Sequence, residues 1–248
     1  MRVETQSNGA NLWQQESEGP FVAAVRQQFS HQPPKPSIEL YQKRAVAYGK
    51  AVQYMKDNSV RVANLSWSRW KKLFVKSLRV HKMGDSRAER DLLADQILQI
   101  EHKALYEAIK NAPEILFVTS AGNLGNAANG KAIPSLFDLP NIIRAGAVDH
   151  KGHPVLNARN TVIDIYALGF NVPAKTVGGL EVRSMGTSIS CAQVTNVVAK
   201  MLAVNKELTP IQIKSLILET GTPCEKKQSI MVIHPQRAVD AAKQSSDR

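Results

Sequence analysis

The chain of 248 residues has little cysteine and no long apolar run. Only Cys191 and Cys224 are present, too few for the disulfide framework of a small secreted domain, so we expect two free or buried thiols. No stretch approaches the ~20 apolar residues that cross a bilayer, so no membrane span is expected. The opening Met1-Arg2-Val3-Glu4 does not resemble a signal peptide, which leaves export without support within these residues.

The sequence also lacks the spacing of histidine, cysteine and carboxylate residues that is typical of a zinc site. The turn Asn126-Ala127-Ala128-Asn129-Gly130-Lys131 has no carboxylate, so it gives no reason to expect a calcium ion. We therefore expect neither a metal nor a cofactor.

Positive charge, in contrast, is plentiful: the formal net charge is +11 and the isoelectric point is near 9.7. Clustered lysine and arginine are the electrostatic footprint of nucleic-acid binding. Here most of the charge is scattered, and the one dense run begins at Arg69-Trp70-Lys71-Lys72 and ends at Arg90. We expect residues 69–88 to form a solvated basic loop and expect no nucleic-acid partner. The alternative is a basic interaction module formed by residues 69–90.

Hydrophobic periodicity predicts helices that alternate with strands. Helices are expected over residues 37–57, 89–110, 187–202 and 209–219, with Ser37 as an N-cap and Pro210 at the first helical position. Strands are expected over residues 60–65, 115–118, 142–148 and 162–166. Such alternation is typical of an α/β fold, with a mainly parallel sheet flanked by helices. Residues 1–36 are expected to be irregular.

Two short loops hold the candidate chemistry. Ser188 opens a predicted helix, so its N–H group and the helix dipole would face an oxyanion formed there. Asn123 follows the predicted strand and the tight turn at Gly122, and its side-chain amide could supply a second donor. Each loop alone is a weak signal, because serine is a common helix cap and Gly-Asn is common in turns. The two together, each beside the element that the chemistry requires, are a stronger one.

The segments Phe117-Val118-Thr119-Ser120-Ala121-Gly122-Asn123 and Ser184-Met185-Gly186-Thr187-Ser188 resemble the oxyanion and nucleophile loops of a subtilisin-like serine peptidase. Residues 60–68 are similar to the subtilase strand that runs beside the bound peptide, although subtilases usually have glycine where Ser68 stands. The resemblance covers residues 37–243. It implies a peptide or protein substrate that forms an acyl-enzyme on Ser188, with substrate-binding residues Ser66, Trp67, Ser68, Ser120, Ala121 and Gly122. It also implies one partial, N-terminally incomplete peptidase-like domain over residues 1–248, with 1–36 as its irregular remnant.

The rest of the catalytic triad does not match. The family orders its triad Asp, His, Ser, and the best register against the histidine motif places Asn8 where the base should stand. An amide has no basic nitrogen and cannot accept the serine proton. The aspartate motif would precede Met1, and we expect the other histidines to be exposed polar residues. The resemblance therefore implies a serine endopeptidase domain that is inactive as this isolated chain. The alternative is a pseudopeptidase that holds peptides without cutting them.

A second nucleophile is conceivable at Cys191, three residues after Ser188 and on the same helical face. A small buried core residue is the favoured interpretation. The family usually has a proline shortly after the serine. The segment Gly186-Thr187-Ser188-Ile189-Ser190-Cys191-Ala192 has no proline.

Overall fold

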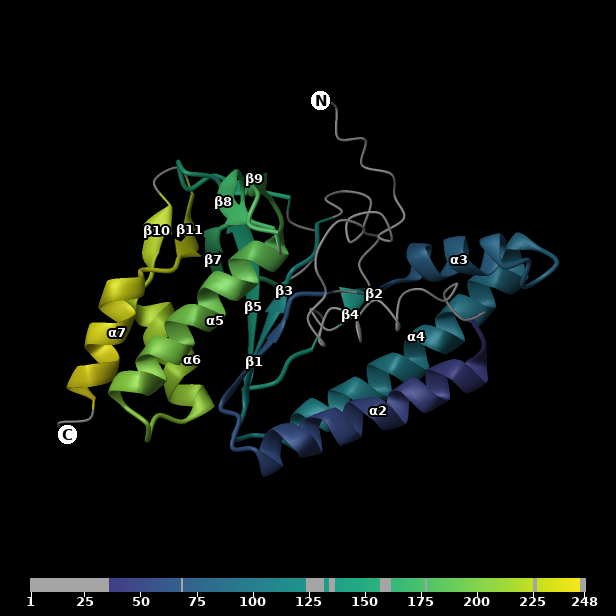
Figure 1. Ribbon diagram of the computed structural model, residues 1–248, viewed down its shortest axis with the longest axis horizontal. Coiled ribbons are helices and arrows are strands. Elements are labelled where there is room, and N and C mark those ends of the chain that lie inside the picture. The colour runs from purple at the N-terminus through teal and green to yellow at the C-terminus, as the bar shows by residue number, and fades with distance from the viewer. Residues whose placement is uncertain are drawn as a thin grey trace.

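The computed structural model is an α/β fold whose central sheet is mainly parallel (Figure 1). It describes residues 36–67, 69–123, 132–133, 137–156, 162–176, 178–224 and 227–245. The predicted fold class is therefore confirmed. Asn8, Ser68 and nearly all of the expected irregular segment 1–36 lie outside the described residues.

Seven strands of the described residues form the central sheet, in the order β1-β3-β5-β7-β11-β10, with β6 paired to β5. β1, β3, β5, β7 and β11 pair in parallel, whereas β6 and β10 pair antiparallel to their neighbours. The strands are β1 (Val62–Leu65), β3 (Leu116–Ser120), β5 (Ile142–Val148), β6 (Pro154–Val155), β7 (Ile165–Leu168), β10 (Thr222–Cys224) and β11 (Lys227–Val232). β1 is an edge strand of this sheet.

Helices cover both faces of the sheet (Figure 1). Side chains alternate between the faces along each strand, so Phe117 packs with one helical layer while Leu116 and Val118 pack with the other. The first layer comprises α2 (Ile38–Asp57), α3 (Lys71–Val80) and α4 (Arg87–Lys110), and the second comprises α5 (Thr187–Val204), α6 (Pro210–Thr220) and α7 (Pro235–Gln244). Burial on both faces explains why β3 and β5 are buried along their whole length.

Four predicted helices are confirmed, and three of them, α2, α4 and α6, begin at a side-chain cap. The Ser37 hydroxyl accepts from the Leu40 N–H at the start of α2. Ser86 caps α4 in the same way. Thr209 and Gln212 form a capping box at α6, with Pro210 at its first position. Each cap satisfies helix-terminal N–H groups that have no partner within the helix.

The expected basic loop over residues 69–88 is wrong. Arg69–Trp70 is a short strand, β2, paired antiparallel to β4 (Ala132–Ile133), and the next ten residues are α3. Phe74 and Leu78, one turn apart on α3, are buried and belong to the core beneath α2 and α4. An amphipathic helix needs only one apolar face, and here that face is short and surrounded in the sequence by lysine and arginine. In sequence the run therefore has the pattern of a charged loop.

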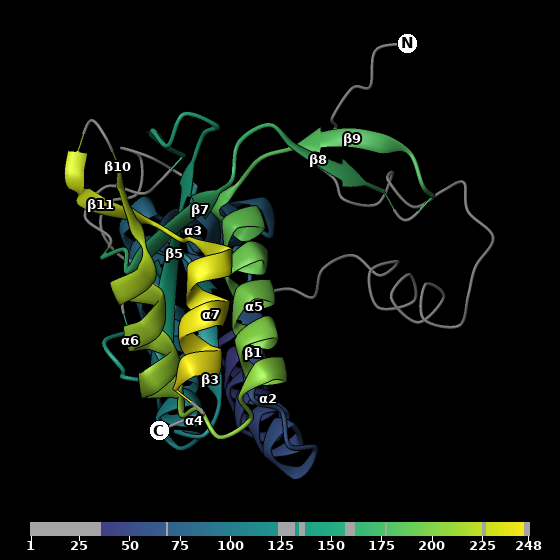
Figure 2. The same ribbon diagram turned by 90° about the vertical axis from the view of Figure 1, so that its left-hand side faces the viewer.

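Several elements near the C-terminal end were not predicted or were shifted. The strand expected over residues 162–166 is β7, which begins at Ile165. β8 (Val172–Lys175) and β9 (Glu181–Ser184) form a two-stranded arm that projects from the body and leads into α5 (Figure 2). β10, β11 and α7 complete the sheet edge and the second helical layer. Among the described helices, none is long and apolar enough to cross a membrane.

Candidate active site

Ser188 lies in the first turn of α5, which begins at a glycine rather than at a polar cap. Gly186 has φ of +148° and ψ of 153°, a backbone conformation that residues with a Cβ rarely adopt. This turn leaves the Ser188 N–H among the helix-terminal donors without a helical acceptor. The Ser188 side chain is half-buried, so it can be reached from solvent.

A hydrogen-bond network joins the two candidate loops through Thr187; we call Gly122, Asn123, Thr187 and Ser188 the Thr187 junction. Asn123 Oδ1 accepts from both the N–H and the hydroxyl of Thr187, each at 2.8 Å. The Thr187 hydroxyl oxygen in turn accepts from the Gly122 N–H at 3.1 Å. Because Oδ1 takes both Thr187 donors, the Nδ2 group is the part of Asn123 left for another acceptor.

The structure therefore brings Asn123 and Ser188 to one place. A Cβ built on Gly186 would lie 3.3 Å from Asn123 Nδ2 and 3.7 Å from the Ser188 nitrogen, so both donors border the same small space. No described acceptor takes a hydrogen bond from either of them. Two N–H donors that converge beside a serine hydroxyl can stabilise a negatively charged oxygen.

The Ser188 hydroxyl itself donates to a backbone carbonyl. Its Oγ lies 3.0 Å from the Ser66 carbonyl oxygen, just beyond the end of β1. The Ser66 hydroxyl lies 3.0 Å from the Ser188 carbonyl and 2.8 Å from Asn64 Oδ1. A carbonyl oxygen is not a base, so this partner holds the hydroxyl without activating it.

Cys191 is a buried core residue beneath this turn. Its Sγ lies 2.8 Å from Asn64 Oδ1 and 3.1 Å from the Val118 carbonyl oxygen. Burial raises the pKa of the Cys191 thiol to about 12. The thiolate is the reactive form of cysteine, so this thiol is not poised as a nucleophile.

The predicted substrate-binding residues Ser120, Ala121 and Gly122 lie at the end of β3 and are all buried. Gly122 has φ of +96°, and a Cβ there would lie 2.3 Å from Cζ2 of Trp70. The Trp70 indole thus packs directly over this turn, and it is itself only 5% exposed. Glycine is required here for both the backbone conformation and the close approach of the ring.

Trp67, another predicted substrate-binding residue, belongs to a cluster with Tyr48, Arg69 and Glu101; we call this the Glu101 cluster. The Trp67 ring stacks on Tyr48, and the Arg69 guanidinium lies 5.3 Å from the Trp67 ring centre. Tyr48 donates to Glu101 Oε1 at 3.1 Å, and Arg69 Nε lies 3.5 Å from Glu101 Oε2. Arg69 Nε and Glu101 Oε2 are buried without a hydrogen-bond partner. Burial raises the pKa of Glu101, although Arg69, Tyr48 and Arg44 oppose the shift.

No described histidine lies within hydrogen-bonding distance of Ser188. His81 ends α3, His102 stacks on Tyr106, and His234 caps α7. His150 lies 3.4 Å from the Asn171 carbonyl, and His153 lies 3.3 Å from Asp149. Within the described ranges, no group of three or more histidine, cysteine and carboxylate side chains is placed to hold a metal ion.

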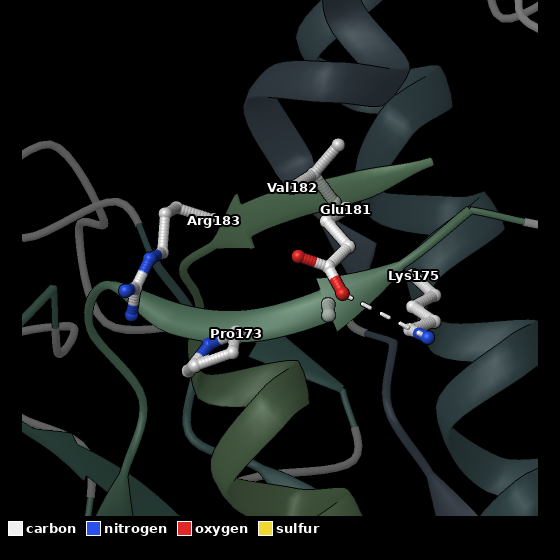
Figure 3. Close-up of a pocket in the computed structure, with 6 residues that line it drawn as sticks. Pro173, Lys175, Glu181, Val182 and Arg183 are labelled. Carbon is white, nitrogen blue, oxygen red and sulfur yellow. Dashed lines mark ion pairs between the residues drawn. The ribbon is translucent and has the colours of Figure 1, made fainter. Parts of the chain in front are cut away.

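A hollow of about 480 Å³ lies on the projecting arm (Figure 3). The Lys175–Glu181 ion pair crosses it with a separation of 3.8 Å, and both side chains are largely exposed. An exposed pair of this kind contributes little to stability or binding. None of the residues that line the hollow is a candidate active-site residue.

Sequence reasoning missed two residues that organise the site, Thr187 and Asn64. Thr187 is fully buried and connects both loops, yet in sequence it looks like an ordinary first-turn threonine. Asn64 Oδ1 is an acceptor for both Ser66 and Cys191. An asparagine in an apolar strand was the available signal, because strand interiors are poor in asparagine.

Comparison with known proteins identifies the family. The model of the subtilase family matches residues 42–242, which is most of the chain. The chain belongs to the subtilase family. This confirms the predicted resemblance, and the coarse function that follows is that of a subtilase-family protease domain. No curated protein matches the chain.

Solved structures that share this fold include two proteases and a subtilase cytotoxin. The prenylagaramide maturation protease PagA has a TM-score of 0.58 and 20% identity over 80% of this chain and 67% of its own. The self-cleaved protease domain of PatA has a TM-score of 0.58 and 19% identity over 81% and 68%. The subtilase cytotoxin SubAB has a TM-score of 0.56 and 17% identity over 80% and 65%. At these identities the likeness shows the fold alone, and the chain spans about two thirds of each neighbour.

Proposed function

We propose that this chain is a subtilisin-like serine endopeptidase domain that is inactive on its own. Ser188 is the nucleophile position on which the acyl-enzyme would form. The Asn123 side-chain amide and the Ser188 N–H are the donors for the oxyanion of the tetrahedral intermediate. The observation that carries the inactivity is the Ser188 hydroxyl, which donates to the Ser66 carbonyl instead of to a base.

A serine without a base is a poor nucleophile at neutral pH. General-base assistance contributes about 10²–10⁴-fold, and the loss of a triad as a unit costs more. Asn8, the proposed counterpart of the family histidine, cannot supply this assistance because its side chain has no basic nitrogen. The donors of the Thr187 junction can still stabilise an oxyanion, which alone gives only a small residual rate.

A fluorophosphonate probe tests the nucleophile directly. We expect the purified chain to remain unlabelled at Ser188, in the same way as its Ser188→Ala control. Stoichiometric labelling that disappears in Ser188→Ala would overturn the proposed inactivity and reveal a base. The variant Asn8→His tests the register separately: a gain of Ser188-dependent labelling supports it, and no gain argues against Asn8 as the position of the base.

A second candidate function is peptide binding without cleavage. β1 is an edge strand of the described sheet, and Ser66 and Trp67 extend it toward Ser188. An extended peptide can add to such an edge through backbone hydrogen bonds, which require no triad. In the proposed complex residues 66–68 pair with the peptide, and Ser120, Ala121 and Gly122 border the adjoining side-chain position.

Isothermal titration against extended peptides tests this second function, with Ser188→Ala protein to exclude any turnover. We expect weak binding that Trp67→Ala reduces, since the indole lies on the proposed binding segment. Tyr54→Ala, which removes an exposed aromatic ring from α2, is the control and should leave binding unchanged. If the folded protein binds no extended peptide, the pseudopeptidase alternative is excluded.

A further inference from the structure

The outward surface of α3 combines three cations with two exposed aliphatic side chains. We call this surface the cationic face; it consists of Lys72, Leu73, Lys76, Arg79 and Val80. Leu73 is 51% exposed and Val80 is 67% exposed. We propose that the cationic face binds an acidic, extended segment of a partner polypeptide.

Helical spacing places these five residues together. Positions i, i+1, i+4, i+7 and i+8 share one side of a helix, and all five members of the cationic face are exposed. The opposite side is anchored to the core by Phe74 and Leu78, which are 6% and 1% exposed. Lys71 ties the start of the helix to α4 through an ion pair of 2.7 Å with Asp95. α3, which lies beside α4 (Figure 1), therefore holds its cations on a fixed scaffold.

The charges of the cationic face have no partner within the part of the chain that the structure describes. No side chain of Lys72, Lys76 or Arg79 forms a hydrogen bond or ion pair there. The neighbouring carboxylates of α4 are already engaged: Asp95 binds Lys71, and Glu89 accepts from the Asp85 N–H. Unneutralised charge of one sign raises the local concentration of oppositely charged partners.

The spacing of the cations fits an extended acidic segment. With ~1.5 Å rise per helical residue, Lys72 and Lys76 are about 6 Å apart along the axis, and Lys76 and Arg79 are about 4.5 Å apart. Every second side chain of an extended peptide lies on one side, at intervals of ~6.8 Å. Carboxylates at alternate positions of such a segment can therefore each reach a different cation.

Two other anionic partners fit less well. An interfacial membrane helix needs a broad apolar face, whereas only Leu73 and Val80 are exposed aliphatic residues here. Single-stranded nucleic acid is usually bound with stacking aromatic side chains, and the cationic face has none. The proposal goes beyond the peptidase function, since the cationic face lies on a different element from Ser188 and needs no catalysis.

Fluorescence anisotropy with a labelled peptide of alternating glutamate and serine, four glutamates long, provides the test. The matched probe replaces each glutamate by glutamine. At low ionic strength we expect the acidic probe to bind at least about tenfold more tightly, with a strong loss of affinity at ~0.5 M salt because screening shortens the reach of the charges. Equal binding of the two probes overturns the proposal.

Charge reversal then locates the binding surface. Lys72→Glu/Lys76→Glu should weaken binding of the acidic probe about fivefold or more, since each exposed ion pair is worth up to ~1 kcal/mol or about fivefold. Lys200→Glu/Lys206→Glu makes the same change in net charge at exposed positions on α5 and just after it. This control should weaken binding by less than about twofold. Equal losses in the two variants would show a net-charge effect and overturn the assignment to α3.

Titrations with two other anionic ligands decide the class of partner. Vesicles with phosphatidylserine and a single-stranded oligonucleotide are each titrated against the same protein and its Lys72→Glu/Lys76→Glu variant. We expect neither to bind more tightly than the acidic peptide. Tighter binding of either, lost in the variant, would overturn the polypeptide partner in favour of a membrane or a nucleic acid. Circular dichroism verifies that both variants remain folded.

Discussion

The Thr187 junction and the Glu101 cluster lie next to each other, because the junction contacts Ser66 and the cluster contains Trp67. They differ in whether their buried polar groups have hydrogen-bond partners. In the junction, the buried donors of Thr187 and Gly122 all have acceptors at 2.8–3.1 Å. In the Glu101 cluster, Arg69 Nε and Glu101 Oε2 are buried and form no hydrogen bond, although they lie 3.5 Å apart as an ion pair. A satisfied network fixes geometry, whereas an unsatisfied one carries a desolvation cost.

This difference concerns how firmly each region holds its polar groups. The junction holds Asn123 and Ser188 in a defined relation even though no described base contacts Ser188. The Glu101 cluster positions Trp67 through a carboxylate whose charged form is disfavoured by burial. We therefore expect the junction to be rigid and independent of pH, and the cluster to respond to protonation.

The carboxylate of Asp164 has all its hydrogen-bond partners, so its removal should have a larger effect on stability than a change in the junction or the cluster. Asp164 accepts from the Arg144 side chain at 2.7 and 2.9 Å and lies 3.4 Å from Lys214. Although burial alone would raise its pKa, the hydrogen bonds from Arg144 and the charge of Lys214 lower the pKa of Asp164 overall. Asp164→Asn should cost about 3–5 kcal/mol of unfolding free energy at pH 7, because it leaves a buried arginine uncompensated.

The pH dependence of the stability of Asp164→Asn tests whether the pKa of Asp164 is indeed lowered in the folded state. A lowered pKa in the folded state means that the stabilisation is present above the unfolded value of about 3.9 and is lost as pH falls through the folded pKa. Urea unfolding from pH 7 to pH 3 should therefore show the wild type and Asp164→Asn converging at acid pH. Parallel curves would contradict the stabilising role of the carboxylate.

Gly122→Ala should break the junction at its tightest contact. The added Cβ would lie 2.3 Å from the Trp70 ring, at a φ of +96°. Overpacking and backbone strain each cost about 1–3 kcal/mol, so a loss of about 3 kcal/mol in urea unfolding is expected. Gly49→Ala is the control: this helical glycine has no atom within 4 Å of its Cβ position, and alanine should stabilise by about 0.5–1 kcal/mol. A neutral Gly122→Ala would show that the turn is not constrained.

Thr187→Val removes the central hydroxyl of the junction with little change of shape. It leaves the buried Gly122 N–H without an acceptor, which should cost about 1–3 kcal/mol of unfolding free energy. The control on the same helix is Thr195→Val, whose hydroxyl only bonds back to the Cys191 carbonyl. That variant should change stability by less than about 0.5 kcal/mol. Equal effects at the two positions would refute the special role of Thr187.

Glu101→Gln tests the Glu101 cluster and should change the free energy of unfolding least among these variants. Because the pKa of Glu101 is raised in the folded state, its contribution is fully present below about pH 4.3 and is lost as pH rises through the folded pKa. The substituted amide keeps an acceptor for Tyr48, so we expect a change within about 1 kcal/mol at pH 7. Relative to wild type, the variant should gain stability as pH rises from 4 to 7.

The matched control for that variant is Glu107→Gln, an exposed glutamate on the same helix. As a substitution of an exposed side chain, it should change the free energy of unfolding by less than about 0.5 kcal/mol at pH 7. A loss of more than about 2 kcal/mol in Glu101→Gln at pH 7 would reveal a net stabilising ion pair and remove the contrast with the junction.

The amino-acid pattern predicted most of the fold because its long elements carry local signals. α2 and α6 begin at their predicted caps, and the buried strands β3 and β5 are apolar along most of their length. α3 was missed because its buried stripe of Phe74 and Leu78 is short and surrounded by lysine. The strands β8, β9, β10 and β11 were not predicted either. β8 and β9 form an arm without the apolar alternation of a strand that packs on a core, and β10 and β11 are short or irregularly paired.

The sequence by itself determined the family, the alternation of strands and helices, and the places of the two loops after β3 and before α5, because each depends on residues close together along the chain. Only the tertiary structure decided that Thr187 joins these loops, that the Ser188 hydroxyl turns to the Ser66 carbonyl, and that Trp70 covers Gly122. It also decided which lysines of α3 face outward. These are contacts between segments far apart in the chain, and their geometry depends on how the parallel strands bring their ends to one edge of the sheet.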